Sequence, residues 1–90
     1  MSKVLVVYTM KGCSHCDDFK NMLKENNIEY HNRDIDEHEE EYNLFTELTN
    51  DFVPAFMVFE EETEKVEYFA PELNYDTLEE AIEIVKKTII

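Results

Sequence analysis

The chain contains few of the residues that interrupt regular structure. Its 90 residues include 1 Gly, 2 Pro and no Trp. No apolar run approaches the roughly 20 residues that a membrane-spanning helix needs. The first residues also lack the length and the small-residue cleavage site of a signal peptide. We therefore expect one domain over residues 1–90, with no membrane contact and a cytoplasmic location.

Basic residues are also scarce. The chain has 8 Lys and Arg against 22 Asp and Glu, which gives a formal net charge of −14. A protein that binds nucleic acid needs clustered cations to neutralise phosphates, so this balance argues against nucleic acid as a partner. It argues equally against anionic membranes. Such a charge favours solubility, and a preference for basic patches on partner proteins is the alternative interpretation. A monomer is the default expectation.

The only two cysteines, Cys13 and Cys16, enclose two residues. A disulfide across so short a loop stabilises a fold little, because the stabilisation grows with loop length. In a cytoplasmic protein this spacing points to redox chemistry or to metal binding.

Hydrophobic patterning predicts an α/β chain in the order β-α-β-α-β-β-α. The expected strands cover residues 3–9, 28–34 and 55–59, followed by a short edge strand around Val66 and Tyr68. The expected helices begin at residue 13 or 14, at 36 and near 76. Asp36 with Glu39, and Asp76 with Glu79, resemble capping boxes. Leu44, Phe45 and Leu48 form the expected apolar side of the second helix. These elements predict a three-layer fold around a four-stranded mixed sheet.

The cysteine pair lies where a strand turns into the first helix. A thiol attacks a disulfide only as its thiolate, and unpaired amide groups at a helix N-terminus favour that anion. Cys13 holds this position, and Cys16 follows on the same side of the helix. The spacing therefore predicts that Cys13 is the nucleophile and that Cys16 resolves the mixed disulfide.

Metal or iron–sulfur binding is the alternative for a Cys-x-x-Cys pair. Such sites require three or four ligands, and the chain has no second cysteine pair. His15 is the nearest further ligand, and a cluster shared between two subunits stays open. We expect no metal.

Several segments together resemble the glutaredoxins, a family with the thioredoxin fold. They are Val7-Tyr8-Thr9 leading to Cys13-Ser14-His15-Cys16, then Ile28-Glu29-Tyr30 before Asp34-Ile35-Asp36, and finally Val53-Pro54 before an apolar strand. The resemblance covers nearly the whole chain and is strongest up to Phe59. It implies a glutaredoxin-type thioredoxin fold.

The resemblance also implies a binding site beside the cysteines. Val53-Pro54 is expected to have a cis peptide bond, with the backbone of Val53 facing the substrate. Lys11 lies one residue later than the family's glutathione-binding lysine, and we expect it to bind a carboxylate of glutathione in its place. Asp76 and Thr77 fall where the family holds the glutamyl end of glutathione, although Leu73-Asn74 replace the usual Gly-Gly before them.

The two residues between the cysteines also differ from the family, which mostly has Pro-Tyr or Pro-Phe there. His15 resembles the histidine of more oxidising dithiol proteins, because an imidazolium near the pair stabilises the thiolate. A surface histidine without a redox role is the alternative. Asp17 and Asp18 act in the opposite direction, because they disfavour a neighbouring thiolate.

The sequence thus predicts an enzyme that reduces protein disulfides or glutathione mixed disulfides through Cys13 and Cys16. Glutathione is the expected co-substrate, with no tightly bound cofactor. An alternative is a redoxin that is reduced by thioredoxin reductase. Ribonucleotide reductase is a natural acceptor under either interpretation. A metal-binding module and a redox-inert adaptor are the predictions from other functional classes.

Overall fold

The computed structural model describes residues 3–50 and 52–89. These residues form the elements in the predicted order. They are β1 (Lys3–Thr9), α1 (Ser14–Glu25), β2 (His31–Asp34), α2 (Glu39–Leu48), β3 (Ala55–Glu60), β4 (Lys65–Phe69) and α3 (Leu78–Ile89). Over these same residues, no helix has the length and apolar character required to span a membrane.

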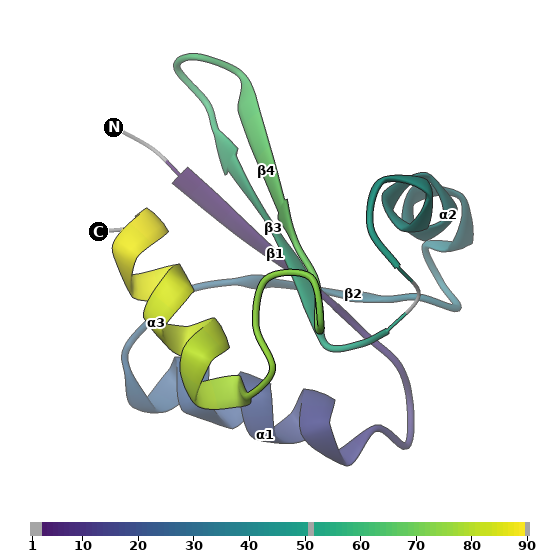
Figure 1. The fold of residues 1–90 in the computed structure, drawn as a ribbon, viewed down its shortest axis with the longest axis horizontal. Helices are drawn as coiled ribbons and strands as arrows, with labels where there is room; N and C mark the ends of the chain where they lie inside the picture. The colour runs from purple at the N-terminus through teal and green to yellow at the C-terminus, as the bar shows by residue number, and fades with distance from the viewer. Residues whose placement is uncertain (1–2, 51, 90) are drawn as a thin grey trace.

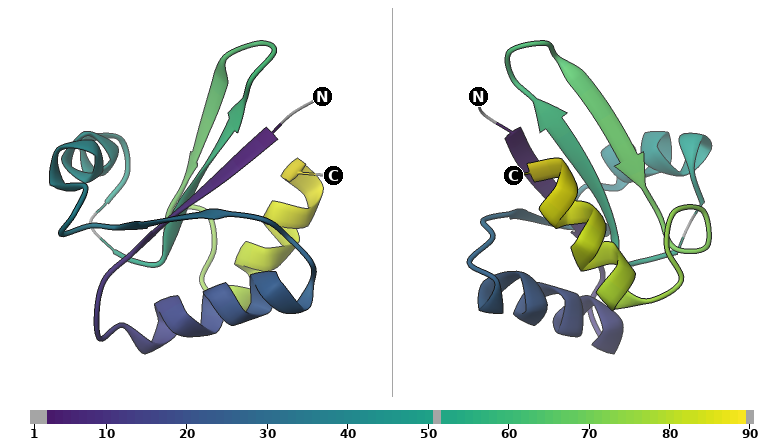
Figure 2. Two further views of the ribbon diagram at one scale, coloured as in Figure 1. Left: turned by 180° about the vertical axis from the view of Figure 1, so that it is seen from behind. Right: turned by 60° about the vertical axis from the view of Figure 1, so that its left-hand side comes forward.

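The four strands form one mixed sheet in the order β2-β1-β3-β4. β1 and β2 run parallel, whereas β1 pairs with β3, and β3 with β4, in the antiparallel sense. Helices α1 and α3 cover one face of the sheet and α2 covers the other, which gives the predicted three layers (Figures 1 and 2). In this arrangement the loop that leads from β1 into α1 and the start of α3 lie at the same end of the fold.

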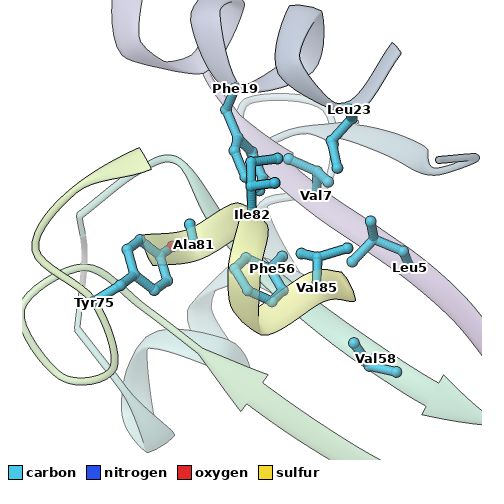
Figure 3. Close-up of a cluster of buried hydrophobic side chains, with 10 residues drawn as sticks. All are labelled: Leu5, Val7, Phe19, Leu23, Phe56, Val58, Tyr75, Ala81, Ile82 and Val85. Carbon is cyan, nitrogen blue, oxygen red and sulfur yellow. The ribbon is translucent and has the colours of Figure 1, made fainter. Parts of the chain in front are cut away.

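The larger core fills the space between the sheet and helices α1 and α3 (Figure 3). Phe56 lies at its centre with no exposed surface. Its ring stacks on those of Phe19 and Tyr75, with centroids 5.7 and 5.6 Å away, and on that of Phe69 at 4.9 Å. Each such side chain contributes on the order of 1.5–3 kcal/mol when it is removed from water. This core fixes α1 and the segment before α3 against the sheet.

A smaller core attaches α2 to the opposite face. Tyr8 of β1 packs against Phe45 of α2, with ring centroids 4.7 Å apart. The Tyr8 hydroxyl also donates a 2.6 Å hydrogen bond to the carboxylate of Glu41, which accepts a second bond from Arg33. Burial, together with the Glu41 carboxylate, raises the pKa of Tyr8 above its ordinary value. The phenol is therefore held neutral as a donor that ties α2 to the sheet.

The second strand is shorter than the sequence predicts. It begins at His31 rather than at residue 28, because the preceding residues complete the end of α1. Asn27 adopts a positive φ of 56°. The N–H of Ile28 then donates to the carbonyl of Leu23, and that of Asn27 donates to Lys24. This pattern is a Schellman motif, and it turns Ile28 away from the sheet ladder.

The predicted start of the second helix is wrong. Asp36 does not cap α2, which begins at Glu39. Instead, the carboxylate of Asp34 accepts the N–H of Asp36, and the Asp34 carbonyl accepts those of Glu37 and His38. These bonds form a turn that delays the helix.

The apolar side of α2 is also different from the prediction. Tyr42 and Phe45 are its buried residues, whereas Leu44 and Leu48 are each 64% exposed. Tyr42 precedes Phe45 by three residues and faces the same side of the helix, so the two aromatic rings occupy the sheet surface and turn both leucines to solvent.

The adjacent residues Leu44 and Phe45 of α2 therefore differ sharply in the exposure of their side chains. Phe45→Ala is expected to lower the free energy of unfolding by about 3–5 kcal/mol, because it opens a cavity beneath the helix. Leu44→Ala is the matched control, and it should change stability by less than about 0.5 kcal/mol. Urea unfolding followed by circular dichroism measures both. A loss at Leu44 equal to that at Phe45 would show that the helix faces the sheet with the leucines.

Candidate active site

The cysteine pair follows a tight turn at the end of β1. Gly12, the only glycine, has a φ of 77°, which glycine adopts without the steric cost that other residues meet. Nothing lies within 4 Å of where its Cβ would be, so the turn needs glycine for its backbone angle and not for space. The turn places Cys13 directly before α1.

Cys13 is the N-cap residue of α1, and its Sγ accepts the backbone N–H of Cys16 at 3.1 Å. The two cysteines form a disulfide. The side chain of Cys13 is half-buried, whereas Cys16 is only 1% exposed. When the disulfide opens, the same N–H and the positive end of the helix dipole are in place to stabilise a thiolate on Cys13. The arrangement favours attack by Cys13 and leaves Cys16 inside.

A groove of about 430 Å³ opens beside the pair. Its lining combines one residue between the cysteines with the segment before β3 and the segment that enters α3, namely His15, Val53, Pro54, Pro71, Tyr75, Asp76, Thr77, Leu78 and Glu79. The Val53–Pro54 peptide bond is cis, as the resemblance implied. Hydrogen bonds between described residues use neither the N–H nor the C=O of Val53.

Hydrogen bonds connect the two sides of the groove. The hydroxyl of Tyr75 donates to the carbonyl of Pro54 at 2.6 Å, and Tyr75 is only 5% exposed. The side-chain amide of Asn50 donates to the carbonyl of Pro71 at 2.7 Å and accepts the N–H of Phe52. These contacts hold the segment around Pro54 at a fixed position relative to the start of α3.

Five of the site residues predicted from the sequence line this groove: His15, Val53, Pro54, Asp76 and Thr77. Lys11 does not line it; this lysine is exposed in the turn before Cys13. Its glutathione-binding role and the redox role of His15 stay predictions.

The capping box of α3 is shifted by one residue from the predicted pair. The hydroxyl of Thr77 accepts the N–H of Glu80, and the Glu80 carboxylate accepts the N–H groups of Thr77 and Asp76. Thr77-Leu78-Glu79-Glu80 therefore forms the box in place of Asp76 and Glu79. This leaves the carboxylates of Asp76 and Glu79 exposed on the groove.

Sequence reasoning missed Tyr75, Asn50 and Pro71. All three lie in irregular segments, where hydrophobic periodicity carries no information. The one available signal was Tyr75 itself, a large aromatic residue in a polar stretch directly before a helix.

Within the described residues, no three His, Cys, Asp or Glu side chains come close enough to hold a metal ion. A metal or cluster bound through Cys13 and Cys16 would therefore require ligands from outside this part of the chain.

The glutaredoxin family profile matches residues 5–61, which include both cysteines, Val53 and Pro54. The chain belongs to the glutaredoxin family. Family membership and the Cys13–Cys16 pair together support a thiol–disulfide oxidoreductase. No curated protein matches the sequence.

A solved structure shows the same fold as this glutaredoxin. It is the first thioredoxin domain of mouse protein disulfide-isomerase A4, in solution, with a TM-score of 0.56 and 18% identity. The match covers 96% of this chain and 62% of that chain. Since the identity is low, the likeness establishes the thioredoxin-like architecture alone.

Replacement of Tyr75 by Phe tests the contact across the groove. At neutral pH, Tyr75→Phe should lower the free energy of unfolding by about 1–3 kcal/mol, because the buried Pro54 carbonyl loses its donor. Burial raises the pKa of Tyr75, so the fold favours the neutral phenol. The contribution of the Tyr75 phenol to the free energy of unfolding is complete below the unfolded-state pKa of about 10 and is lost as the pH rises above that value.

The stability difference between the wild type and Tyr75→Phe should therefore shrink between about pH 9 and pH 11. Denaturant unfolding of the oxidised proteins at both pH values measures it. Tyr68→Phe removes a hydroxyl from a partly exposed tyrosine of β4 that donates no hydrogen bond to a described residue, and it is the matched control. A gap that stays constant with pH would contradict the assigned contact.

Proposed function

We propose that this glutaredoxin reduces protein disulfides and glutathione mixed disulfides, with glutathione as its reductant. The observation that carries the proposal is the position of Cys13: it caps α1, accepts the N–H of Cys16 and lies beside a groove lined by Val53, whose backbone bonds no described residue. The fold thus places Cys13 where a thiolate would be stabilised once the disulfide opens, beside a surface on which an extended chain can lie.

The reaction is a two-electron exchange in two steps. The Cys13 thiolate attacks one sulfur of the partner disulfide; a mixed disulfide forms, and the other partner sulfur leaves as a thiolate that takes a proton. Cys16, once deprotonated, attacks the Cys13 sulfur and releases the partner's second thiol. The product is the Cys13–Cys16 disulfide that the structure contains. Two glutathione molecules then reduce it and leave as glutathione disulfide.

The buried position of Cys16 supports this order. At 1% exposure, its sulfur cannot meet a protein disulfide first, yet it already lies within bonding reach of Cys13. The first step therefore belongs to Cys13 and the second to Cys16.

Glutathione binding is supported by Asp76. Its carboxylate is exposed on the groove, where it can accept the ammonium of the glutamyl end. The hydroxyl and N–H of Thr77 already bond Glu80, so Thr77 contributes through its place in the lining. His15 is the single basic residue among the groove-lining residues, and a glutathione carboxylate can pair with its cationic form.

Reduction by thioredoxin reductase is the second candidate. It is favoured by the absence of Lys and Arg from the groove lining, because glutathione presents two carboxylates that such residues pair with. Ribonucleotide reductase is a suitable disulfide acceptor under either reductant. We propose a cytoplasmic monomer in both cases.

Turnover of a small glutathione mixed disulfide, coupled to glutathione reductase, tests the proposal. Cys13→Ser should lose activity by at least about a thousandfold, because no nucleophile remains. Cys16→Ser should keep part of the activity, since free glutathione can resolve the mixed disulfide.

The two variants serve as each other's controls, because each removes one sulfur atom from the same disulfide. Activity that survives in Cys13→Ser but not in Cys16→Ser would reverse the assigned roles. A wild type that is inactive with glutathione but active with thioredoxin reductase and its reduced nicotinamide cofactor would replace the reductant and keep the chemistry.

A further inference from the structure

Three of the lysines lie at the end of the molecule away from the cysteines. Lys3, Lys65 and Lys87 line one depression there together with Glu60 and Glu67, and the ammonium of Lys3 donates to the carbonyl of Thr88. β1 runs from Lys3 toward the loop that leads to Cys13, and α3 runs from the groove back toward Lys3 (Figure 1). The lysines and the groove therefore lie at opposite ends of the fold.

Two further basic side chains form ion pairs with carboxylates. Lys20 pairs with Asp17 at 3.6 Å in the first half of α1, and Arg33 pairs with Glu41 at 2.9 Å. Neither basic residue is among those that line the groove. Lys11 is exposed in the turn before Cys13 but does not line the groove. Within the groove lining, His15 is therefore the one basic residue beside the acids.

The groove itself has an uncompensated negative edge. Asp76 and Glu79 are exposed, and no ion pair between described residues involves either of them. Glu80, by contrast, is occupied in the capping box. Asp18 adds a further exposed carboxylate in the first turns of α1. The result is a negative potential along this edge of the groove.

The floor of the groove is apolar, with Val53, Pro54, Pro71 and Leu78 among its lining residues. Lys and Arg side chains suit such a combination, because their hydrocarbon stems cover apolar surface while their charged heads reach the carboxylates. An acidic peptide could use the floor but would be repelled at the edge.

We propose that this groove selects polypeptide disulfides flanked by Lys or Arg, with Asp76 and Glu79 as the residues that determine this specificity. The inference rests on the proposed disulfide reductase function. Binding places the partner cysteine against Cys13 and its basic neighbours against the two carboxylates, and electron transfer follows the two steps given above.

Two synthetic peptides test this selectivity. Both are short, differ only in carrying Arg or Glu on each side of one cysteine, and are joined through that cysteine to 2-mercaptoethanol in a mixed disulfide. The pre-reduced full-length protein is mixed with each peptide without glutathione, and release of peptide thiol gives the second-order rate constant. Each constant is divided by that for dithiothreitol, which removes the intrinsic reactivity of the peptide.

The normalised rate for the Arg peptide should exceed that for the Glu peptide by about tenfold at low salt, because opposite charges speed the encounter. The preference should fall steeply near 1 M salt, where the screening length is about 3 Å. Asp76→Asn with Glu79→Gln should remove most of it. Glu61→Gln, at an exposed position in the turn between β3 and β4, should leave it unchanged.

Equal normalised rates for the two peptides in the wild type would overturn the charge selection while leaving the reductase function in place. A loss of preference in Glu61→Gln as large as in the groove variant would overturn it too, because overall charge would then be responsible. Failure to reduce either peptide would overturn the proposed function together with this inference.

Discussion

The ring of Phe56 makes the contacts on which the geometry of the site depends. It is fully buried and stacks on Phe19 and Tyr75, which come from α1 and from the segment before α3. Phe19 lies three residues beyond Cys16, and Phe56 itself lies two residues beyond Pro54. Three segments that are distant in sequence therefore meet at one cluster of rings. Because interiors are close-packed, a shift of any ring moves the groove that these segments line.

The chemistry follows from what this packing leaves at the surface. α1 is held so that its first turn follows directly on the loop from β1, with Cys13 half-buried at its N-terminus and Cys16 enclosed behind it. The difference in exposure separates the two roles without any difference in residue type. The groove then determines which partner can approach, and in this chain its exposed charges are the carboxylates of Asp76 and Glu79. Reactivity and selectivity thus come from separate features of the same site.

Much of this could be predicted from the sequence. The continuous apolar run of β1 and the helical spacing of Phe19 and Leu23 located the first strand and helix, and therefore the cysteines. Features that depend on individual hydrogen bonds could not be predicted from the sequence. The Asp34 turn delays α2, and the choice of Thr77 over Asp76 as the cap of α3 depends on which side chain meets which N–H. The sequence placed Leu44 on the buried side of α2, whereas it is exposed. Periodicity identifies an apolar face of a helix, but the packing of the Tyr42 and Phe45 rings decides which residues are buried.

The start of α1 makes Cys13 the reactive thiol while Cys16 stays enclosed. The most direct test is to treat the fully reduced protein with less than one equivalent of iodoacetamide at mildly acidic pH and to locate the label by peptide mass spectrometry. Nearly all of the label is expected on Cys13, because only that sulfur is accessible and stabilised as a thiolate. Label on Cys16, or an equal division between the two cysteines, would contradict it.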